Sequence, residues 1–184
     1  MQSGAEVSLA LSETERLEAI GYIEPVMRER FKCEPPPTRG LIFIARAKGA
    51  IVGSIVLEGM ADASPFPIEG RYAFDPKDAP YPFDRPYIVQ GTRWIATAPG
   101  VSNLLVRTAM RVAYELGKRH MLIEAKPYSV KRLGELGIVC REIGNARLRA
   151  DEVLAMVGEA GMLYFTEPPV PTLYLMELRQ AFGE

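Results

Sequence analysis

The residues with the clearest chemical potential lie between Tyr87 and Asn103. An expected strand over residues 87–96 ends in Gln90-Gly91-Thr92-Arg93-Trp94-Ile95-Ala96, and the turn Ala98-Pro99-Gly100-Val101-Ser102-Asn103 follows. A long amphipathic helix begins in this turn, so its free backbone N–H groups lie beside the end of the strand. These groups and the helix dipole both favour an anion. The order predicts a site for a phosphate-bearing cofactor or carrier arm, with backbone N–H groups supplied by Gly100, Val101, Ser102 and Asn103; Ser102 is equally suited to an N-cap role.

Side chains of a strand alternate between its two faces. Strict alternation places Gln90, Thr92 and Trp94 on one face, and Val89, Gly91, Arg93 and Ile95 on the other. The Arg93 guanidinium suits bidentate binding of a substrate carboxylate, and it suits a structural ion pair under the sheet equally well. Gln90 and Thr92 are candidates for hydrogen bonds to a substrate, with ordinary strand packing as the alternative.

Composition excludes several classes of function. The chain has 184 residues, 48% of them apolar and 24% charged, which suits one domain over residues 1–184. A net charge of −1 gives no global basic field that would draw the chain to nucleic acid. Cys33 and Cys140 fit no metal spacing and are expected to be buried thiols in a reducing cytoplasm. No signal peptide or membrane-spanning run is recognisable, so we expect a cytoplasmic protein without a bound metal.

The elements that must position the site follow from periodicity and turn signals. Ser12 and Glu15 form a capping-box pattern, which predicts a helix that runs to about Phe31. A short strand over 6–10 precedes this helix, and a hairpin over 41–46 and 50–60 follows it. Residues 61–86 hold interleaved prolines and aromatics, which fit a packed surface loop or a lid over a substrate.

Helices and strands alternate in the second half of the chain. Helices are expected over 101–116, 129–136 and 151–159, and strands over 121–125, 138–143 and 172–178. This alternation implies some parallel pairing in the middle of one central sheet. The sequence thus predicts a mixed α/β (α+β) fold with about three to five helices around the sheet.

This layout resembles the GNAT superfamily of N-acyltransferases. More narrowly, it is similar to the acyl-homoserine lactone synthases and the N-acyl amino acid synthases, mainly over residues 41–145. The run Gln90-Gly91-Thr92-Arg93 stands where those autoinducer synthases carry Glu-x-Ser/Thr-Arg. The segment from Tyr128 to Ile138 resembles their short helix and the Gly-Ile start of the next strand, and Met27-Arg28-Glu29-Arg30-Phe31 resembles their first helix.

The resemblance implies a mixed sheet of about seven strands, splayed between strands four and five. It implies acyl transfer from a phosphopantetheine thioester, on acyl carrier protein or coenzyme A, to the amine of an amino-acid-like acceptor. The acyl-phosphopantetheine would be a co-substrate, with no cofactor bound permanently. Its arm would lie along Trp94, Ile95 and Ala96 and its phosphate in the turn 100–103. Trp94 is a candidate for lining an acyl channel, with core packing as the alternative.

Departures from the family pattern change which residue is expected to act as the general base and which acceptor is expected. The motif glutamate is Gln90 here, and an amide cannot accept a proton as a carboxylate does. Glu58, at the end of a long apolar strand, is the best remaining carboxylate for a general base if it is not at a solvated strand end, and Glu124 is the second choice. Residues that accompany S-adenosylmethionine use have no clear match. The leading hypothesis is an N-acyl amino acid synthase; a lactone synthase, a coenzyme A-dependent acetyltransferase and a non-catalytic carrier-binding module are the alternatives.

A carrier protein would also need a surface to dock on. Acyl carrier proteins are acidic, so a local basic face would speed their encounter with this chain. Basic residues that lie off the core stripe are candidates for such a face: Arg107, Arg111, Lys118, Arg119, Lys131 and Arg132. An ordinary solvated helix surface is the alternative interpretation.

Overall fold

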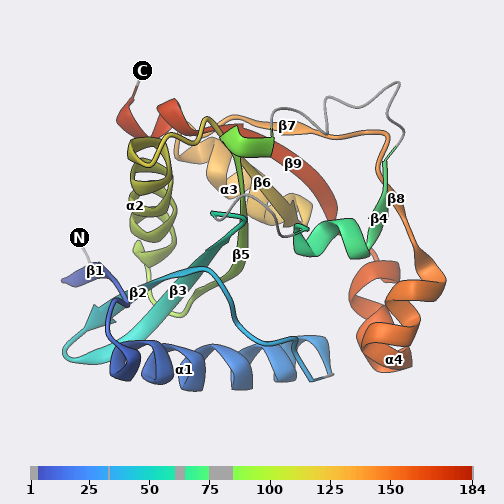
Figure 1. Cartoon of the computed structure of the whole chain (residues 1–184), viewed down its shortest axis with the longest axis horizontal. Coiled ribbons are helices and arrows are strands. Elements are labelled where there is room, and N and C mark those ends of the chain that lie inside the picture. Colours follow the sequence, from blue (N-terminus) through green and yellow to red (C-terminus); the bar gives the residue numbers. More distant parts are fainter. Residues whose placement is uncertain (1–3, 33, 61–64, 75–84, 184) are drawn as a thin grey trace.

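A mixed sheet of seven strands forms the centre of the molecule (Figure 1). The computed structural model describes residues 4–32, 34–60, 65–74 and 85–183. Across the sheet the order is β1-β2-β3-β5-β6-β9-β7, and only β5 and β6 pair in parallel. The strands are β1 (Ala5–Leu9), β2 (Leu41–Ala47), β3 (Ala50–Glu58), β5 (Ile88–Ala96), β6 (His120–Ala125), β7 (Cys140–Glu142) and β9 (Thr172–Glu177). The prediction of a mixed, GNAT-like sheet is confirmed.

Helices cover both faces of this sheet. One face packs against α1 (Glu13–Phe31), which begins at the expected capping box of Ser12 and Glu15. The other face packs against α2 (Val101–Glu115) and the C-terminal turn η3 (Leu178–Phe182), while α3 (Pro127–Glu135) lies further along the chain. We call these the α1 face and the α2 face. Figure 1 shows α4 (Ala150–Thr166) beyond the end of α1, next to the short helix η1 (Pro67–Gly70); a further 3-10 turn, η2 (Arg85–Tyr87), leads into β5.

The central parallel pair, β5 and β6, separates early. The resemblance predicts this for the fourth and fifth strands of the family, to which β5 and β6 correspond. The ladder between β5 and β6 runs only from the pair Ile88–His120 to the pair Gly91–Ile123. Beyond it, β5 continues to Ala96 on the side of β3, and β6 turns to pair with β9 alone. Residues 92–96 therefore leave one backbone edge of β5 without a strand partner. Unpaired N–H and C=O groups at such an edge can bind an extended ligand.

A β-bulge at Arg93 corrects the predicted alternation of faces. Arg93 has a φ of 48°, and the register with β3 shifts between Ser54 and Val56. The extra residue reverses the order of side chains beyond it. Trp94 consequently packs on the α2 face, whereas Ile95 joins the core under α1. The prediction that Trp94 shares a face with Thr92 is wrong for this reason.

Two further features escaped the sequence interpretation. A two-stranded ribbon pairs β4 (Tyr72–Ala73) with β8 (Arg147–Leu148), and two-residue strands are too short to show a period. The last helix extends to Thr166 instead of ending at Glu159, with a kink at Gly158, whose φ is 68°. Of the expected lid over 61–86, only residues 65–74 and 85–86 belong to the described part of the chain.

The close packing of β3 on α2 gives a first testable prediction. A Cβ atom on Gly53 would lie 2.7 Å from Val101 Cγ1 and 2.8 Å from the Ile95 carbonyl oxygen. Gly53→Ala should therefore lower the free energy of unfolding by about 1–3 kcal/mol, the usual cost of overpacking. Gly21→Ala, in the middle of α1 with nothing within 4 Å, should raise it by about 0.5–1 kcal/mol. Urea denaturation of both variants measures the difference, and equal midpoints would contradict the packing described here.

Candidate functional site

A buried ion pair lies on the α1 face where β5 bulges. Arg93 Nη1 donates to Glu58 Oε1 at 2.5 Å, and Thr92 Oγ1 donates to the same oxygen at 2.8 Å. The two charged side chains are only 7% and 13% exposed. Arg93 Nη2 donates to the backbone carbonyls of Pro36 and Pro37. Three of the four residues predicted to be catalytic, Glu58, Thr92 and Arg93, thus form one network.

These contacts bear on the open roles of Glu58 and Arg93. Glu58 is not at a solvated strand end, because it is largely buried against Arg93. Both terminal nitrogens of Arg93 have acceptors within the protein. The structural ion pair weighed for Arg93 is therefore present, and a carboxylate ligand would have to displace existing contacts. The role of carboxylate anchor stays a prediction for Arg93.

The position of Glu58 explains how the chain manages without the motif glutamate. Glu58 on β3 is the direct cross-strand partner of Gln90 on β5, and both side chains lie on the α1 face. Side chains of directly opposed residues lie close enough to take each other's place beside a third group. The carboxylate beside Arg93 is therefore supplied by Glu58 on β3, while position 90 on β5, where the related motif has a glutamate, holds an amide.

Gln90 itself lies beneath η1. Its side chain is fully buried, and its Oε1 accepts a hydrogen bond of 3.2 Å from the backbone N–H of Ile68. Its Nε2 is buried without a partner among the described residues. A buried donor left unpaired costs about 1–3 kcal/mol. Gln90 thus fixes η1 over β5 through its amide oxygen.

The predicted phosphate turn has the expected backbone. Gly100, with a φ of 79°, is the N-cap residue of α2, so the alternative that Ser102 caps the helix is wrong. Val101 packs in the core, Ser102 is buried, and Asn103 Oδ1 accepts from Arg107 Nε at 3.0 Å. The Val101 N–H donates to the Ala98 carbonyl at 3.4 Å, and the next N–H groups, in the first turn of α2, have no intrahelical acceptors.

The arm-binding candidates on β5 fall on different sides of the sheet. Trp94 packs beside the α2-face core, and its indole Nε1 is buried without a partner among the described residues. Ile95 is buried in the core on the α1 face, so only its backbone is available to a ligand along the strand edge. Ala96 is exposed at the strand end, next to the phosphate turn.

A second buried ion pair was missed by the sequence analysis. Arg71 Nε donates to Glu124 Oε2 at 3.1 Å, and both side chains are largely buried. Burial and the charge of Glu124 raise the pKa of the Tyr72 and Tyr164 hydroxyls, which therefore stay protonated. Glu124 was predicted as the second-choice base. Its partner Arg71 was not predicted, because it lies in the proline-rich segment, which shows no periodicity.

The proposed basic face is smaller than expected. Lys118 is buried, and its Nζ donates to the carbonyls of Gly59 and Pro86, so its assignment to that face is wrong. Arg107 and Arg111 donate to backbone carbonyls of the C-terminal turn. Lys131 and Arg132 on α3 remain exposed.

Other reactive groups contribute little here. Cys140 is half-buried, rather than fully buried as expected, and burial raises the pKa of its thiol to about 11. At neutral pH this thiol is a poor nucleophile. Cys33 lies outside the described residues. Over the described ranges, no group of metal-ligating side chains gathers, and no helix has the length and apolarity to cross a membrane.

Comparison with known proteins places this geometry in a fold family. No family model and no curated protein matches the sequence. TofI, solved in a ternary complex with an inhibitor and MTA, is similar with a TM-score of 0.66 at 12% identity, over 97% of this chain and 96% of TofI. The AHL synthase LasI gives 0.62 at 11% identity, over 97% and 94%. FeeM, an N-acyl amino acid synthase from uncultured soil microbes, gives 0.58 at 10% identity, over 100% and 95%.

The chain has the fold of the autoinducer and N-acyl amino acid synthases. The resemblance read from Gln90 to Arg93 is confirmed at this level. At identities of 10–12%, the likeness establishes the fold and leaves substrates to be argued from the site.

The exchange of the carboxylate between strands is testable. Glu58→Gln leaves the Arg93 charge buried without its partner and should cost about 3 kcal/mol of unfolding free energy. The matched control Glu18→Gln breaks an exposed pair with Arg46 and should cost less than about 1 kcal/mol. Adding Gln90→Glu to Glu58→Gln should recover part of the loss, because position 90 lies directly across from position 58.

Guanidinium denaturation of the original protein, Glu58→Gln, Gln90→Glu and the double variant gives the coupling energy between positions 58 and 90. A double variant that is no more stable than Glu58→Gln alone would show that the two positions are not interchangeable.

Proposed function

We propose that this chain is an N-acyltransferase of the N-acyl amino acid synthase type. It would move a fatty acyl group from the phosphopantetheine thioester of acyl carrier protein to the amine of an amino acid. The observation that carries the proposal is the early separation of β5 from β6 beside the N-terminus of α2. An extended arm with an amide backbone fits a free strand edge, and its phosphate fits a helix N-terminus.

The donor side of the site is supported by groups that lack partners. The edge of β5 over residues 92–96 has no strand on the side of β6. The buried indole Nε1 of Trp94 is a donor without an acceptor among the described residues, and a carbonyl of the arm or of the thioester would supply one. The bulge at Arg93 bends β5 at this point, which widens the gap that the arm enters.

The acceptor side lies on the α1 face. The amine must lose a proton before its nitrogen attacks the thioester carbonyl carbon. The C–N bond then forms, the C–S bond breaks, and the departing thiolate takes a proton. Glu58 is largely buried, and Arg93 and Thr92 both donate to one of its oxygens. Glu124 has the longer contact with its arginine, 3.1 Å against 2.5 Å for Glu58, so in this proposal Glu124 accepts the amine proton.

The test compares donors and acceptors directly. Purified protein is incubated with long-chain acyl carrier protein or long-chain acyl-coenzyme A, with a panel of amino acids and with S-adenosylmethionine. Amide formation and release of free thiol are followed together. Amide from an amino acid supports the proposal, lactone from S-adenosylmethionine supports the lactone synthase alternative, and transfer of only short acyl groups from coenzyme A supports an acetyltransferase. No thiol release with any donor would contradict an acyltransferase.

The phosphate turn gives a prediction in which stability and donor binding change differently. Asn103→Asp places a negative charge in the first turn of α2, which favours the helix and keeps the hydrogen bond with Arg107. Thermal stability should therefore be unchanged or slightly higher. Repulsion of the donor phosphate should raise the donor KM by roughly tenfold at low salt, and less at high salt.

The control for this variant is Thr14→Asp, which adds the same charge to the first turn of α1, at an exposed position. It should leave the donor KM unchanged. Equal donor KM values for the two variants and the original protein would contradict the placement of the donor phosphate at the N-terminus of α2.

A further inference from the structure

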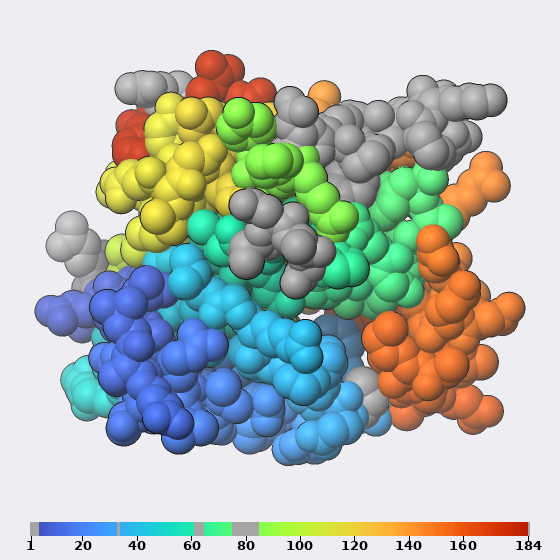
Figure 2. All heavy atoms as spheres, in the orientation of Figure 1, coloured from blue at the N-terminus to red at the C-terminus, as the bar shows by residue number. Residues whose placement is uncertain are grey.

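The ion pair between Arg71 and Glu124 lies at the mouth of the gap between β5 and β6. Glu124 is the first residue of β6 beyond its last pair with β5, Gly91–Ile123, and it shares a sheet face with Leu122. This is the face that carries Glu58 and Arg93. Figure 2 shows a narrow recess at the surface between the segment after α1, η1 and α4. Arg30, at the end of α1, donates to the backbone carbonyl of Trp94, the residue after Arg93.

Arg71 is only partly used by this pair. Among the described residues it donates through Nε alone, to Glu124 Oε2, and its side chain retains 17% exposure. The two terminal nitrogens therefore keep donors free of protein acceptors. A guanidinium donates most effectively to a planar carboxylate through two parallel N–H groups. Arg71 can thus bind a second carboxylate, which Arg93 cannot do without losing existing contacts.

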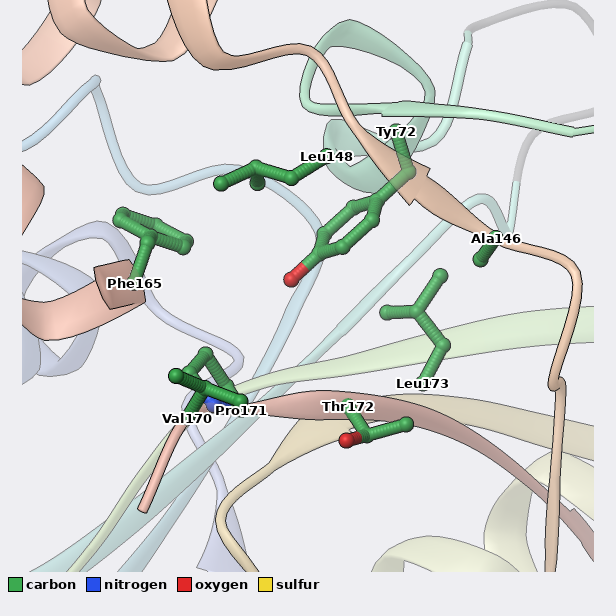
Figure 3. Close-up of a pocket in the computed structure, with 8 residues that line it drawn as sticks. All are labelled: Tyr72, Ala146, Leu148, Phe165, Val170, Pro171, Thr172 and Leu173. Carbon is green, nitrogen blue, oxygen red and sulfur yellow. The ribbon is translucent and has the colours of Figure 1, made fainter. Parts of the chain in front are cut away.

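An apolar pocket adjoins the ion pair. It has a volume of about 190 Å³ and is lined by residues that include Tyr72, Leu148, Phe165, Val170 and Leu173. Figure 3 shows the hydroxyl of Tyr72 pointing into this space, towards Phe165 and Val170. Leu173 is the cross-strand partner of Glu124, so the carboxylate lies beside the pocket wall. A protein cavity of about 150 Å³ accommodates benzene, so this pocket has room for a side chain as large as a phenyl ring.

We propose that Arg71 and Glu124 bind the carboxylate and the ammonium group of a free α-amino acid whose apolar or aromatic side chain occupies this pocket. The proposal rests on the proposed function and names its acceptor class. Charge balance favours a zwitterion: its carboxylate adds a negative charge beside Arg71 and its ammonium group adds a positive charge beside Glu124, so the buried site gains no net charge. An amine without a carboxylate, or a carboxylate without an amine, would add one uncompensated charge.

The same arrangement places the amine for reaction. Glu124 takes one proton from the ammonium group, and the neutral amine attacks the thioester carbon across the gap. The tetrahedral carbon loses thiolate, and the second amine proton passes to that sulfur. The products are an amide and a thiol, with one proton released overall. Glu124 is thus a catalytic residue and Arg71 a binding residue for the carboxylate.

Calorimetry without any acyl donor tests the site independently of turnover. L-phenylalanine should bind, whereas L-phenylalaninamide and N-acetyl-L-phenylalanine, which each lack one charge, should bind at least about tenfold more weakly. Arg71→Gln should abolish the preference for phenylalanine over its amide. Arg46→Gln, which breaks an exposed ion pair at the far edge of the sheet, is the matched control and should leave all three affinities unchanged.

A second variant tests the pocket without a large effect on folding. Val170 lines the pocket but is 42% exposed, so Val170→Trp can fill the space from its rim. It should weaken phenylalanine binding at least tenfold and affect alanine little. Equal binding of phenylalanine and its amide, or phenylalanine binding that is indifferent to Val170→Trp, would overturn the proposal. So would amide synthesis that proceeds equally well in Arg71→Gln.

These outcomes separate the two proposals. Acyl transfer to an amine, without a preference for phenylalanine over its amide, would support the proposed function and contradict the proposed acceptor site. Tight phenylalanine binding without thiol release from any donor would support the proposed amino-acid site and contradict the proposed acyltransferase function.

Discussion

The bulge at Arg93 is the constraint on which the site depends. A non-glycine residue with a φ of 48° costs roughly 1–2 kcal/mol relative to ordinary backbone. Neighbouring groups stabilise this conformation of Arg93. Its guanidinium donates to Glu58 and to the Pro36 and Pro37 carbonyls, and Ser54 Oγ donates to the Arg93 backbone carbonyl. The bulge lies directly beyond the last pair of β5 with β6, Gly91–Ile123, so the gap between the central strands begins at the bulge and is present without a ligand.

The ion pair that fixes this bulge is better understood as a positioning device than as a source of stability. Removing two charges from water offsets most of their attraction, so a buried pair adds little net free energy. Its loss is nevertheless expensive, because the remaining charge is stranded. The pair therefore allows one arrangement of Arg93 and penalises others. Because Glu58 supplies the carboxylate, the network around Arg93 is present with Gln90 in the motif position.

The sequence predicted features that depend on local chemistry. The capping box at Ser12 and Glu15, the apolar stripe of α2 and the turn at Gly100 are readable because each is decided within a few residues. The site residues Glu58, Thr92 and Arg93 were also named, but their pairing was not. Their contact joins β3 to β5, and one inserted residue reversed the side-chain order beyond Thr92. The periodicity of a sequence does not reveal such a bulge. The prediction from strict alternation therefore placed Trp94 on the wrong face of the sheet.

Long-range contacts also account for the residues that were missed. Arg71 follows η1 in a proline-rich segment, and long-range contacts bring it over β6 to Glu124: Gln90 anchors Ile68, and the Arg149 backbone N–H donates to the Arg71 carbonyl. Gln90 is therefore more than a substituted glutamate, since its amide accepts the backbone N–H that positions η1. A carboxylate at position 90 could accept the same bond, but it would add a negative charge beside Glu58 in a site with one Arg93 to balance it. The amide at position 90 and the carboxylate at position 58 are thus complementary: Glu58 pairs with Arg93, and Gln90 supports η1, which leads to Arg71 beside Glu124.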